Sequence, residues 1–191
     1  MDRVVVGITG ASGSIYGKRL VEVLVANSYR VDLIFSETGR RVFEFETGVS
    51  VDKFVNSLPK DLVNLYRPDD LFAPPSSGSH QVKGVVVIPC SAGTLGHIAS
   101  GSTVNLIHRA VDVNLKEGRP VILVFRETPI NRIHAENILR VIDSGATVLP
   151  ASPGFYGKPK GVMELVDFIV ERALRLLLKR EFGLIRNWGA P

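Results

Sequence analysis

The chain has 191 residues with 45% hydrophobic content, 18 glycines and 11 prolines, which is typical of one folded α/β domain over residues 1–191 and excludes a disordered chain. Its net charge of +4 is scattered, so we expect small anionic ligands and no nucleic acid. The lone Cys90 excludes a disulfide framework and a multi-cysteine zinc site. With no signal segment and no apolar run of membrane-spanning length, we expect a soluble, cytoplasmic protein that binds no membrane.

The first segment reads as a strand over 4–8, a loop of small residues over 9–13 and a helix over 15–25. Small residues matter there because the free N–H groups of a helix start can close on an anion only when no side chain intervenes. The glycine spacing matches neither the G-x-G-x-x-G dinucleotide fingerprint nor a P-loop. The segment therefore predicts a phosphate or flavin cradle of unspecified ligand, and the alternative is a glycine-rich turn that binds nothing.

The rest of the chain continues the alternation of strands and helices. Further strands are predicted over 31–35, 82–90, 121–125 and 146–150. Helices are predicted over 38–45, 51–58, 103–116, 131–144 and 162–182. This order predicts a three-layer α/β/α sandwich with a doubly wound parallel sheet, the Rossmann or flavodoxin-like class. The helix over 103–116 is apolar on more than one face, from which we expect oligomerisation to cover it.

Two segments between these elements suit a binding site. The segment 64–81 shows no periodicity, and a loop of this length usually serves a site or an interface. The turn over 91–96 places small and hydroxyl residues directly after a buried strand. Ligands of open parallel sheets collect beyond the carboxyl ends of the strands, so the loops over 9–13 and 91–96 are expected to line one crevice.

Charged and hydroxyl side chains near the later strand ends are candidates for chemistry. Arg126 can grip a phosphate through two N–H groups, or form an ion pair with Glu127 or another acid. Glu127 can act as a general acid or base, or cap a helix. Tyr156 can donate to a phosphate from its Gly/Pro-rich loop, or pack over the sheet edge. The four histidines lack metal-ligand spacing, so no metal site is expected.

Eight motifs, in order along nearly the whole chain, resemble the UbiX family of flavin prenyltransferases. The motifs are Thr9-Gly10-Ala11-Ser12-Gly13, Ala73-Pro74-Pro75-Ser76-Ser77-Gly78-Ser79, Pro89-Cys90-Ser91-Ala92-Gly93-Thr94-Leu95, Asn105-Leu106-Ile107-His108-Arg109-Ala110, Leu115-Lys116-Glu117, Arg126-Glu127-Thr128-Pro129, Pro153-Gly154-Phe155-Tyr156 and Asn187-Trp188-Gly189. Their combination is far more specific than any one of them.

The resemblance implies a flavodoxin-like transferase, related to flavin-containing cysteine decarboxylases. Such an enzyme joins a dimethylallyl group from dimethylallyl monophosphate to N5 and C6 of reduced FMN without a metal ion. The resemblance also implies a homo-oligomer, typically a dodecamer, that delivers prenylated FMN to a partner decarboxylase of the UbiD type.

Site residues follow from the same resemblance. On the FMN side they are Gly10, Ala11, Ser12, Ser36, Ser91, Ala92, Gly93, Thr94 and Arg126. On the prenyl-phosphate side they are Lys116, Arg126, Tyr156 and Arg172, which need not all come from one subunit. Catalytic roles fall to Ser12, to Glu46 as an acid near the flavin, and to Glu127 as the acid that assists proton transfer. The cations and the tyrosine would stabilise the leaving phosphate where other prenyltransferases use magnesium.

One position departs from the pattern, and two other functions are open. Many relatives carry a tryptophan where this chain has Leu71, which affects the wall of the prenyl pocket or an interface. An FMN-dependent decarboxylase of cysteine conjugates is the first alternative, but its P-x-M-N-x-x-M-W motif is absent. A non-catalytic flavin-binding protein is the second, and it would have no use for Lys116, Tyr156 and Arg172.

Overall fold

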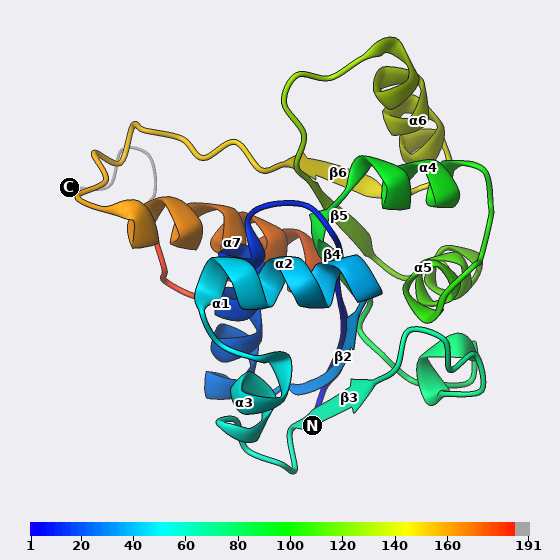
Figure 1. The fold of residues 1–191 in the computed structure, drawn as a ribbon, viewed down its shortest axis with the longest axis horizontal. Coiled ribbons are helices and arrows are strands. Elements are labelled where there is room, and N and C mark those ends of the chain that lie inside the picture. The colour runs from blue at the N-terminus through cyan, green and yellow to red at the C-terminus, as the bar shows by residue number, and fades with distance from the viewer. Residues whose placement is uncertain (186–191) are drawn as a thin grey trace.

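The computed structural model describes residues 1–185 and is built on one six-stranded sheet in the order β3-β2-β1-β4-β5-β6 (Figure 1). All neighbouring strands pair in parallel. The strands are β1 (Arg3–Ile8), β2 (Arg30–Phe35), β3 (Val63–Tyr66), β4 (Val85–Cys90), β5 (Val121–Phe125) and β6 (Thr147–Pro150). Strands β2 and β3 extend the sheet on one side of β1, and β4, β5 and β6 extend it on the other. The strand order therefore reverses between β1 and β4, where sheets of this class bind ligands.

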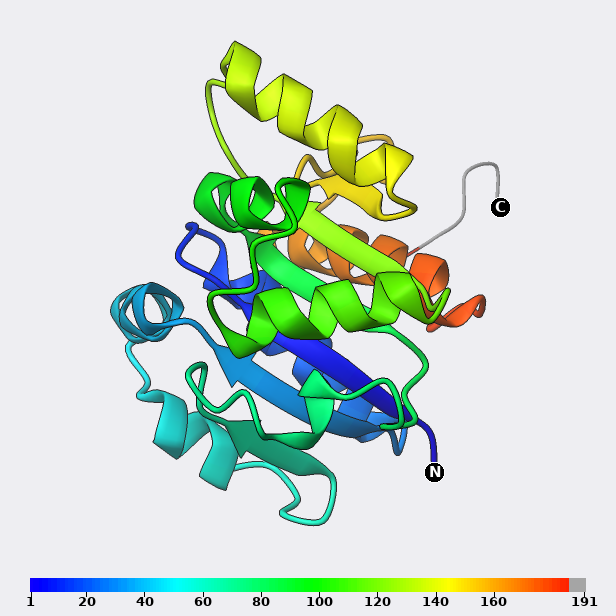
Figure 2. The ribbon, with the colours of Figure 1, turned by 90° about the vertical axis from the view of Figure 1, so that its right-hand side faces the viewer.

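Helices cover both faces of the sheet. They are α1 (Ser14–Ala26), α2 (Glu37–Thr47), α3 (Val51–Asn56), η1 (Pro74–Ser76, a 3₁₀ turn), α4 (Ala92–Ala99), α5 (Leu106–Lys116), α6 (Arg132–Asp143) and α7 (Val162–Leu178). In Figure 2, α5 crosses in front of the sheet while α1 and α7 lie behind it. The predicted three-layer α/β/α class is confirmed, whereas the single-domain assignment over residues 1–191 stays a prediction.

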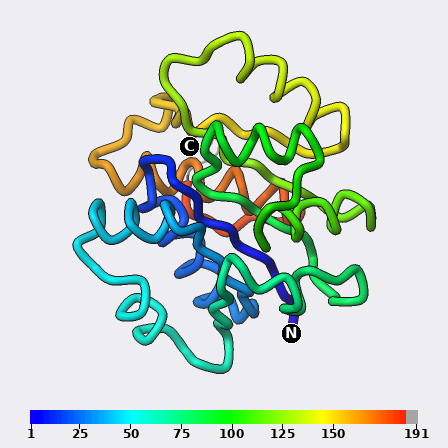
Figure 3. The backbone as a smooth tube through the Cα atoms, turned by 45° about the vertical axis from the view of Figure 1, so that its right-hand side comes forward, coloured from blue at the N-terminus to red at the C-terminus, as the bar shows by residue number. Residues whose placement is uncertain are grey.

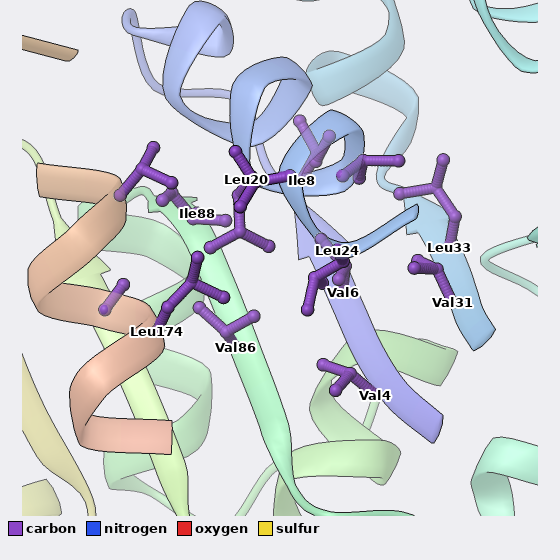
Figure 4. Close-up of a cluster of buried hydrophobic side chains, with 14 of the residues drawn as sticks. Val4, Val6, Ile8, Leu20, Leu24, Val31, Leu33, Val86, Ile88 and Leu174 are labelled. Atoms are coloured by element: carbon purple, nitrogen blue, oxygen red, sulfur yellow. The ribbon is translucent and has the colours of Figure 1, made fainter. Parts of the chain in front are cut away.

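The core is divided into two apolar layers by the sheet. Val4, Val6 and Ile8 of β1 point toward Leu20 and Leu24 of α1 (Figure 4). Val5, between them, points to the opposite layer under α4 and α5. Both faces of β1 are therefore buried, which explains why its sequence is a continuous β-branched run and not an alternating one.

The structure differs from the predicted elements in three places. The segment expected to be irregular from residue 64 contains β3, a four-residue edge strand that pairs with β2. The turn expected over 91–96 is mostly the first part of α4, because the Ser91 side chain accepts the N–H of Thr94 and starts a helix there. The last helix, expected to reach residue 182, ends at Leu178, where Lys179 turns into the left-handed region with φ 55°.

The apolar character of α5 has an explanation within one chain. Leu106, Ile107, Ala110, Val111 and Val113 are each at most 1% exposed, because the sheet lies on one side of α5 and α4 and η1 flank it. The expectation that an oligomer must cover these five side chains is therefore wrong, whereas Val104, which precedes α5 in the predicted helix, is 62% exposed.

Two further features of residues 1–185 bear on the expected class of protein. None of the helices in this range is long and apolar enough to cross a membrane. The same residues contain no group of three or more histidine, cysteine or acidic side chains placed to hold a metal ion.

Candidate functional site

Three helices begin at the carboxyl ends of neighbouring strands, at the place where the chain reverses direction. Ser36, after β2, caps α2 by accepting the N–H of Gly39 at 3.0 Å. Ser91, after β4, caps α4 by accepting the N–H of Thr94 at 3.2 Å. The loop after β1 lies beside the start of α2 (Figure 3). Helix starts gathered at one edge favour an anionic ligand, since each presents N–H groups and the positive end of a dipole.

The loop after β1 ends on an acid from the same chain. Gly13 has φ 102° and gives no side-chain cap to α1. Instead the carboxylate of Glu46, from the last turn of α2, accepts the N–H of Gly13 at 3.0 Å and that of Ser14 at 2.8 Å. The sequence predicted that these N–H groups would be free for a ligand anion, but here they bind Glu46.

The protonation of Glu46 follows from these contacts. Burial raises the pKa of Glu46, but hydrogen bonds from the Ser12 side chain and from the N–H groups of Ser14 and Gly13 outweigh that effect and leave its pKa below the ordinary value. Glu46 is therefore a carboxylate at neutral pH. The structure thus brings together Ser12 and Glu46, two of the predicted catalytic residues.

A buried threonine, which was not among the predicted site residues, joins the ends of β1 and β4. The Thr9 hydroxyl donates to the carbonyl of Pro89 at 2.8 Å and accepts the N–H of Ser91 at 2.9 Å. Thr9 is 1% exposed. It fixes the spacing between the loops that carry Ser12 and Ser91. In the sequence, its position in the motif after β1 could have indicated this role.

Two glycines show that the space at the strand ends is narrow beside α2 and open beside α4. A Cβ on Gly10 would lie 2.5 Å from Cγ2 of Thr38, so only glycine lets the first loop sit this close to α2. A Cβ on Gly93 would meet no atom within 4 Å. The first turn of α4 therefore faces open space that a ligand can enter.

Arg126 and Glu127 follow β5 at the same edge of the sheet. The N–H of Arg126 donates to the carbonyl of Cys90 at 3.1 Å, which holds the residue against the end of β4. Its Nε atom is buried and has no hydrogen-bond partner in the structure. Glu127 instead accepts the N–H of Thr128 at 3.1 Å, and no ion pair joins it to Arg126. The Nε of Arg126 therefore lacks an acceptor among residues 1–185, and a buried donor without a partner is costly.

Tyr156 and Arg172 lie further along, near the last helix. The Tyr156 ring packs edge-on against Phe168 of α7, with 5.7 Å between ring centres. It borders a cavity of about 500 Å³ that Lys158, Lys160 and Phe168 also line. Arg172 is exposed one turn after Phe168 on the same helix.

Lys116 does not reach this site within one chain. It is the last residue of α5, which returns the chain to the beginning of β5, whereas Arg126 follows the end of that strand. Five strand residues separate the two levels by roughly 16 Å. The Lys116 Nζ atom lies 2.7 Å from Oε1 of Glu117, and its side chain is 60% exposed.

Comparison with known proteins identifies the family. Residues 1–174 match the Flavoprotein family. The flavin prenyltransferase UbiX of Halalkalibacterium halodurans is 44% identical, over 96% of this chain and 92% of that protein. The chain belongs to the UbiX family of flavin prenyltransferases.

Solved structures of UbiX relatives share the fold over nearly their whole length. AnUbiX, crystallised in complex with FMN and dimethylallyl pyrophosphate, superposes with a TM-score of 0.93 at 34% identity, covering 100% of this chain and 98% of that one. A dodecameric FMN-dependent UbiX-like decarboxylase from Escherichia coli superposes with a TM-score of 0.91 at 35% identity, covering 98% and 100%. These matches confirm the predicted resemblance and the flavodoxin-like class.

The site residues predicted from the resemblance fall into three groups in this structure. One group surrounds the strand ends: Gly10, Ala11, Ser12, Ser36, Glu46, Ser91, Ala92, Gly93, Thr94, Arg126 and Glu127. A second consists of Tyr156 and Arg172 beside α7, and the third is Lys116 at the far edge. The motif Asn187-Trp188-Gly189 lies outside the described residues. Lys158 and Lys160, which line the cavity with Tyr156, were missed because nothing in a Gly/Pro-rich loop marks which side chains face inward.

Proposed function

We propose that the chain transfers a dimethylallyl group from dimethylallyl monophosphate to N5 and C6 of reduced FMN, releasing phosphate without a metal ion. The observation that carries the proposal is the buried, unpartnered Nε of Arg126, placed among three helix starts in a chain of the UbiX family. A guanidinium in that position needs an anion, and both proposed ligands carry a phosphate.

FMN fits the cradle at the strand ends, where the space over Gly93 is open and the Arg126 donor lacks a protein partner. The residues proposed to hold it are Gly10, Ala11, Ser12, Ser36, Ser91, Ala92, Gly93, Thr94 and Arg126. When bound in reduced form, the flavin supplies the nucleophilic ring atoms that accept the prenyl group. The hydroxyls of Ser36 and Ser91 each cap a helix by accepting an N–H, and the Ser91 O–H also donates to Oγ1 of Thr94 at 3.1 Å, so of the two it is Ser36 that keeps its donor for a ligand.

The prenyl phosphate is proposed to bind Arg126, Tyr156, Arg172 and Lys116. Negative charge grows on the phosphate as the allylic C–O bond breaks, and three cations with one phenol donor would stabilise that charge. Fixed cations do this at no reorganisation cost, which removes the need for magnesium.

Proton transfer is proposed to involve two acids. Glu46 stays ionised and accepts a hydrogen bond from the Ser12 side chain, so the Ser12 O–H points to Glu46 and the Ser12 oxygen can still accept a hydrogen bond from a ligand. Glu127 lies beside Arg126 at the end of β5, where its carboxyl group can take or return the proton that ring closure displaces.

The position of Lys116 supports a homo-oligomer, because a Lys116 that binds the prenyl phosphate would have to come from another copy of the chain. We propose a dodecamer, like the Escherichia coli relative. Exposed apolar side chains away from α5 are available for such contacts: Phe45, Phe72, Ile130, Ile133, Leu139, Ile142, Phe155 and Val162. Mass photometry would give the subunit count, and a monomer at micromolar concentration would contradict the proposal.

The product is proposed to serve a partner decarboxylase of the UbiD type, in the cytoplasm. A free cofactor must be passed on where both proteins meet, and the lone cysteine is compatible with a reducing compartment. Activation of an apo decarboxylase by the reaction product, with both proteins in the cytosolic fraction, would support this step.

The test is anaerobic incubation with reduced FMN and dimethylallyl monophosphate, followed by mass spectrometry of the released flavin. A flavin heavier by one five-carbon unit is expected. Recovery of unmodified FMN alone after this incubation would overturn the transferase and leave the decarboxylase and flavin-storage alternatives. Release of carbon dioxide from a cysteine conjugate would then separate those two.

A further inference from the structure

The chain folds back after α7 and is tied to it by one buried acid. We call residues 181–185 the C-terminal strap. Glu171, in the middle of α7, is 0% exposed, and its carboxylate accepts the N–H of Phe182 and the N–H of Leu184, each at 3.0 Å. Arg175, one turn later, donates Nε to the same carboxylate at 2.6 Å.

Glu171 holds the strap as an anion. Burial raises the pKa of Glu171, but the hydrogen bonds from Arg175 and from the N–H groups of Phe182 and Leu184 outweigh that effect and lower its pKa below the ordinary value. Hydrogen bonds to a charged acceptor are stronger than those between neutral groups. The carboxylate is therefore a firm anchor for two successive strap amides.

A second set of contacts fixes the beginning of the strap. The guanidinium of Arg180 lies 4.4 Å from the centre of the Phe182 ring and donates to Oδ1 of Asn27 at 2.8 Å. The Phe182 ring lies 6.3 Å from that of Tyr29. With this end held against α1 and the middle held by Glu171, the direction of the last strap residues is set.

The strap leads to the cavity beside Tyr156. Leu184 and Ile185 line that cavity together with Tyr156 and Phe168. The Leu184 amide is itself one of the groups that Glu171 binds. The part of the cavity wall that Leu184 forms thus depends directly on the Glu171 carboxylate, although Glu171 is not among the lining residues.

We propose that Glu171 is a positioning residue for the prenyl-phosphate side of the site, where it holds the C-terminal strap as part of the wall of the cavity that Tyr156 also lines. The inference rests on the proposed function, in which Tyr156 contacts the prenyl phosphate. It concerns the binding of that substrate, and no change is expected in the binding of FMN at the carboxyl ends of the strands.

Two substitutions of Glu171 weaken the hydrogen bonds to the strap to different degrees. Glu171→Ala removes every acceptor, and Glu171→Gln keeps one carbonyl oxygen for two amides while losing the charge that Arg175 binds. We expect the KM for dimethylallyl monophosphate to rise roughly tenfold in Glu171→Ala and about threefold in Glu171→Gln, with kcat within about twofold and the Kd for FMN unchanged. Hydrogen–deuterium exchange of the peptide containing the amides of Phe182 and Leu184 should accelerate in the same order.

Glu22→Gln is the matched control. It removes an i,i+4 ion pair with Lys18 on α1 that has no contact with the strap, so neither KM nor strap exchange should change. Faster exchange without a rise in KM would overturn the inference, as would a Kd for FMN that rises in parallel with KM. If the wild-type protein forms no prenylated flavin at all, the proposed function fails first and the inference falls with it, which distinguishes the two failures.

Discussion

The buried Asp32 near the beginning of the strands and the buried Nε of Arg126 at their end differ in whether protein groups satisfy them. At the end where the strands begin, Asp32 is 0% exposed and binds Arg3 at 2.7 Å, His80 at 2.6 Å and Asn64 at 3.2 Å. Arg119 completes this end by donating to the carbonyls of Gly78 and His80. At the end where the strands finish, the Nε of Arg126 is buried without a partner.

The partners of a buried polar group indicate whether it stabilises the fold or is available to a ligand. A buried polar group that protein partners satisfy stabilises the fold, and one without partners is tolerated where a ligand supplies them. The long loop over 67–84 is fastened at the beginning of the strands by Asp32 and Arg119, so its order does not depend on a ligand. At the other end, the Nε of Arg126 has no acceptor among residues 1–185, so the protein does not compensate its burial.

The largest effect that would sharpen this contrast is expected at Arg126. Arg126→Met should lower kcat/KM for prenyl transfer by about 1000-fold, since it removes a cation from the phosphate. Thermal stability should hardly change, because the Nε atom has no protein partner to lose. Arg119→Met is the counterpart, and it should lower the melting temperature by leaving two loop carbonyls without a donor. Equal melting temperatures of the two variants would break the comparison.

A loss of about 3 kcal/mol in the free energy of unfolding is expected for Asp32→Asn, because the change leaves the Arg3 guanidinium beside a neutral group and turns an amide NH2 donor toward groups that themselves donate. Urea denaturation measures it. Asp69→Asn, which removes an exposed pair with Arg67, should leave the urea midpoint unchanged. Loss of FMN binding by folded Asp32→Asn protein would show that the two ends are not independent.

A smaller effect is expected for Glu127→Gln, which keeps the hydrogen bond from the Thr128 N–H while removing the ionisable group. The Kd for FMN should stay the same, and single-turnover formation of prenylated flavin should slow by about 100-fold. Normal turnover would remove the acid–base role from this residue.

His108 tests whether every buried polar atom without a partner marks a ligand site. Its Nδ1 is buried without a partner, but the adjacent hollow is only about 30 Å³, so no ligand is expected. Burial and the nearby His97 lower the pKa of His108 to about 4 from 6.5. The unfolded chain therefore binds this proton first as pH falls, and stability is lost between pH 6.5 and 4, by about 2 kcal/mol at pH 5.

The measurement for His108 is a pair of denaturation series at pH 7 and pH 5. His108→Gln should show a smaller difference between the two pH values than the wild type, whatever its stability at pH 7. Identical pH dependence of the two proteins would mean that His108 is not protonated differently on unfolding.

Local signals in the sequence were sufficient for the main elements of the fold. The apolar run of β1 and the break at Ser91 reflect burial and capping, which act over a few residues. The edge strand β3 was missed because its four residues become a strand only by pairing with β2. Family motifs predicted the site residues, but not that Glu46 would bind the start of α1, since that contact joins residues 33 positions apart.

The contact between Glu46 and the start of α1 affects how fast a ligand can bind. Fixing one backbone residue costs about 1–2 kcal/mol of conformational entropy. Because Glu46 orders the turn at Gly13 and Ser14 as the protein folds, that cost does not oppose the later arrival of the flavin. Flavin association should then proceed in a single phase set by diffusion, with no slow loop closure, and removing the Glu46 carboxylate should introduce a second, slower phase.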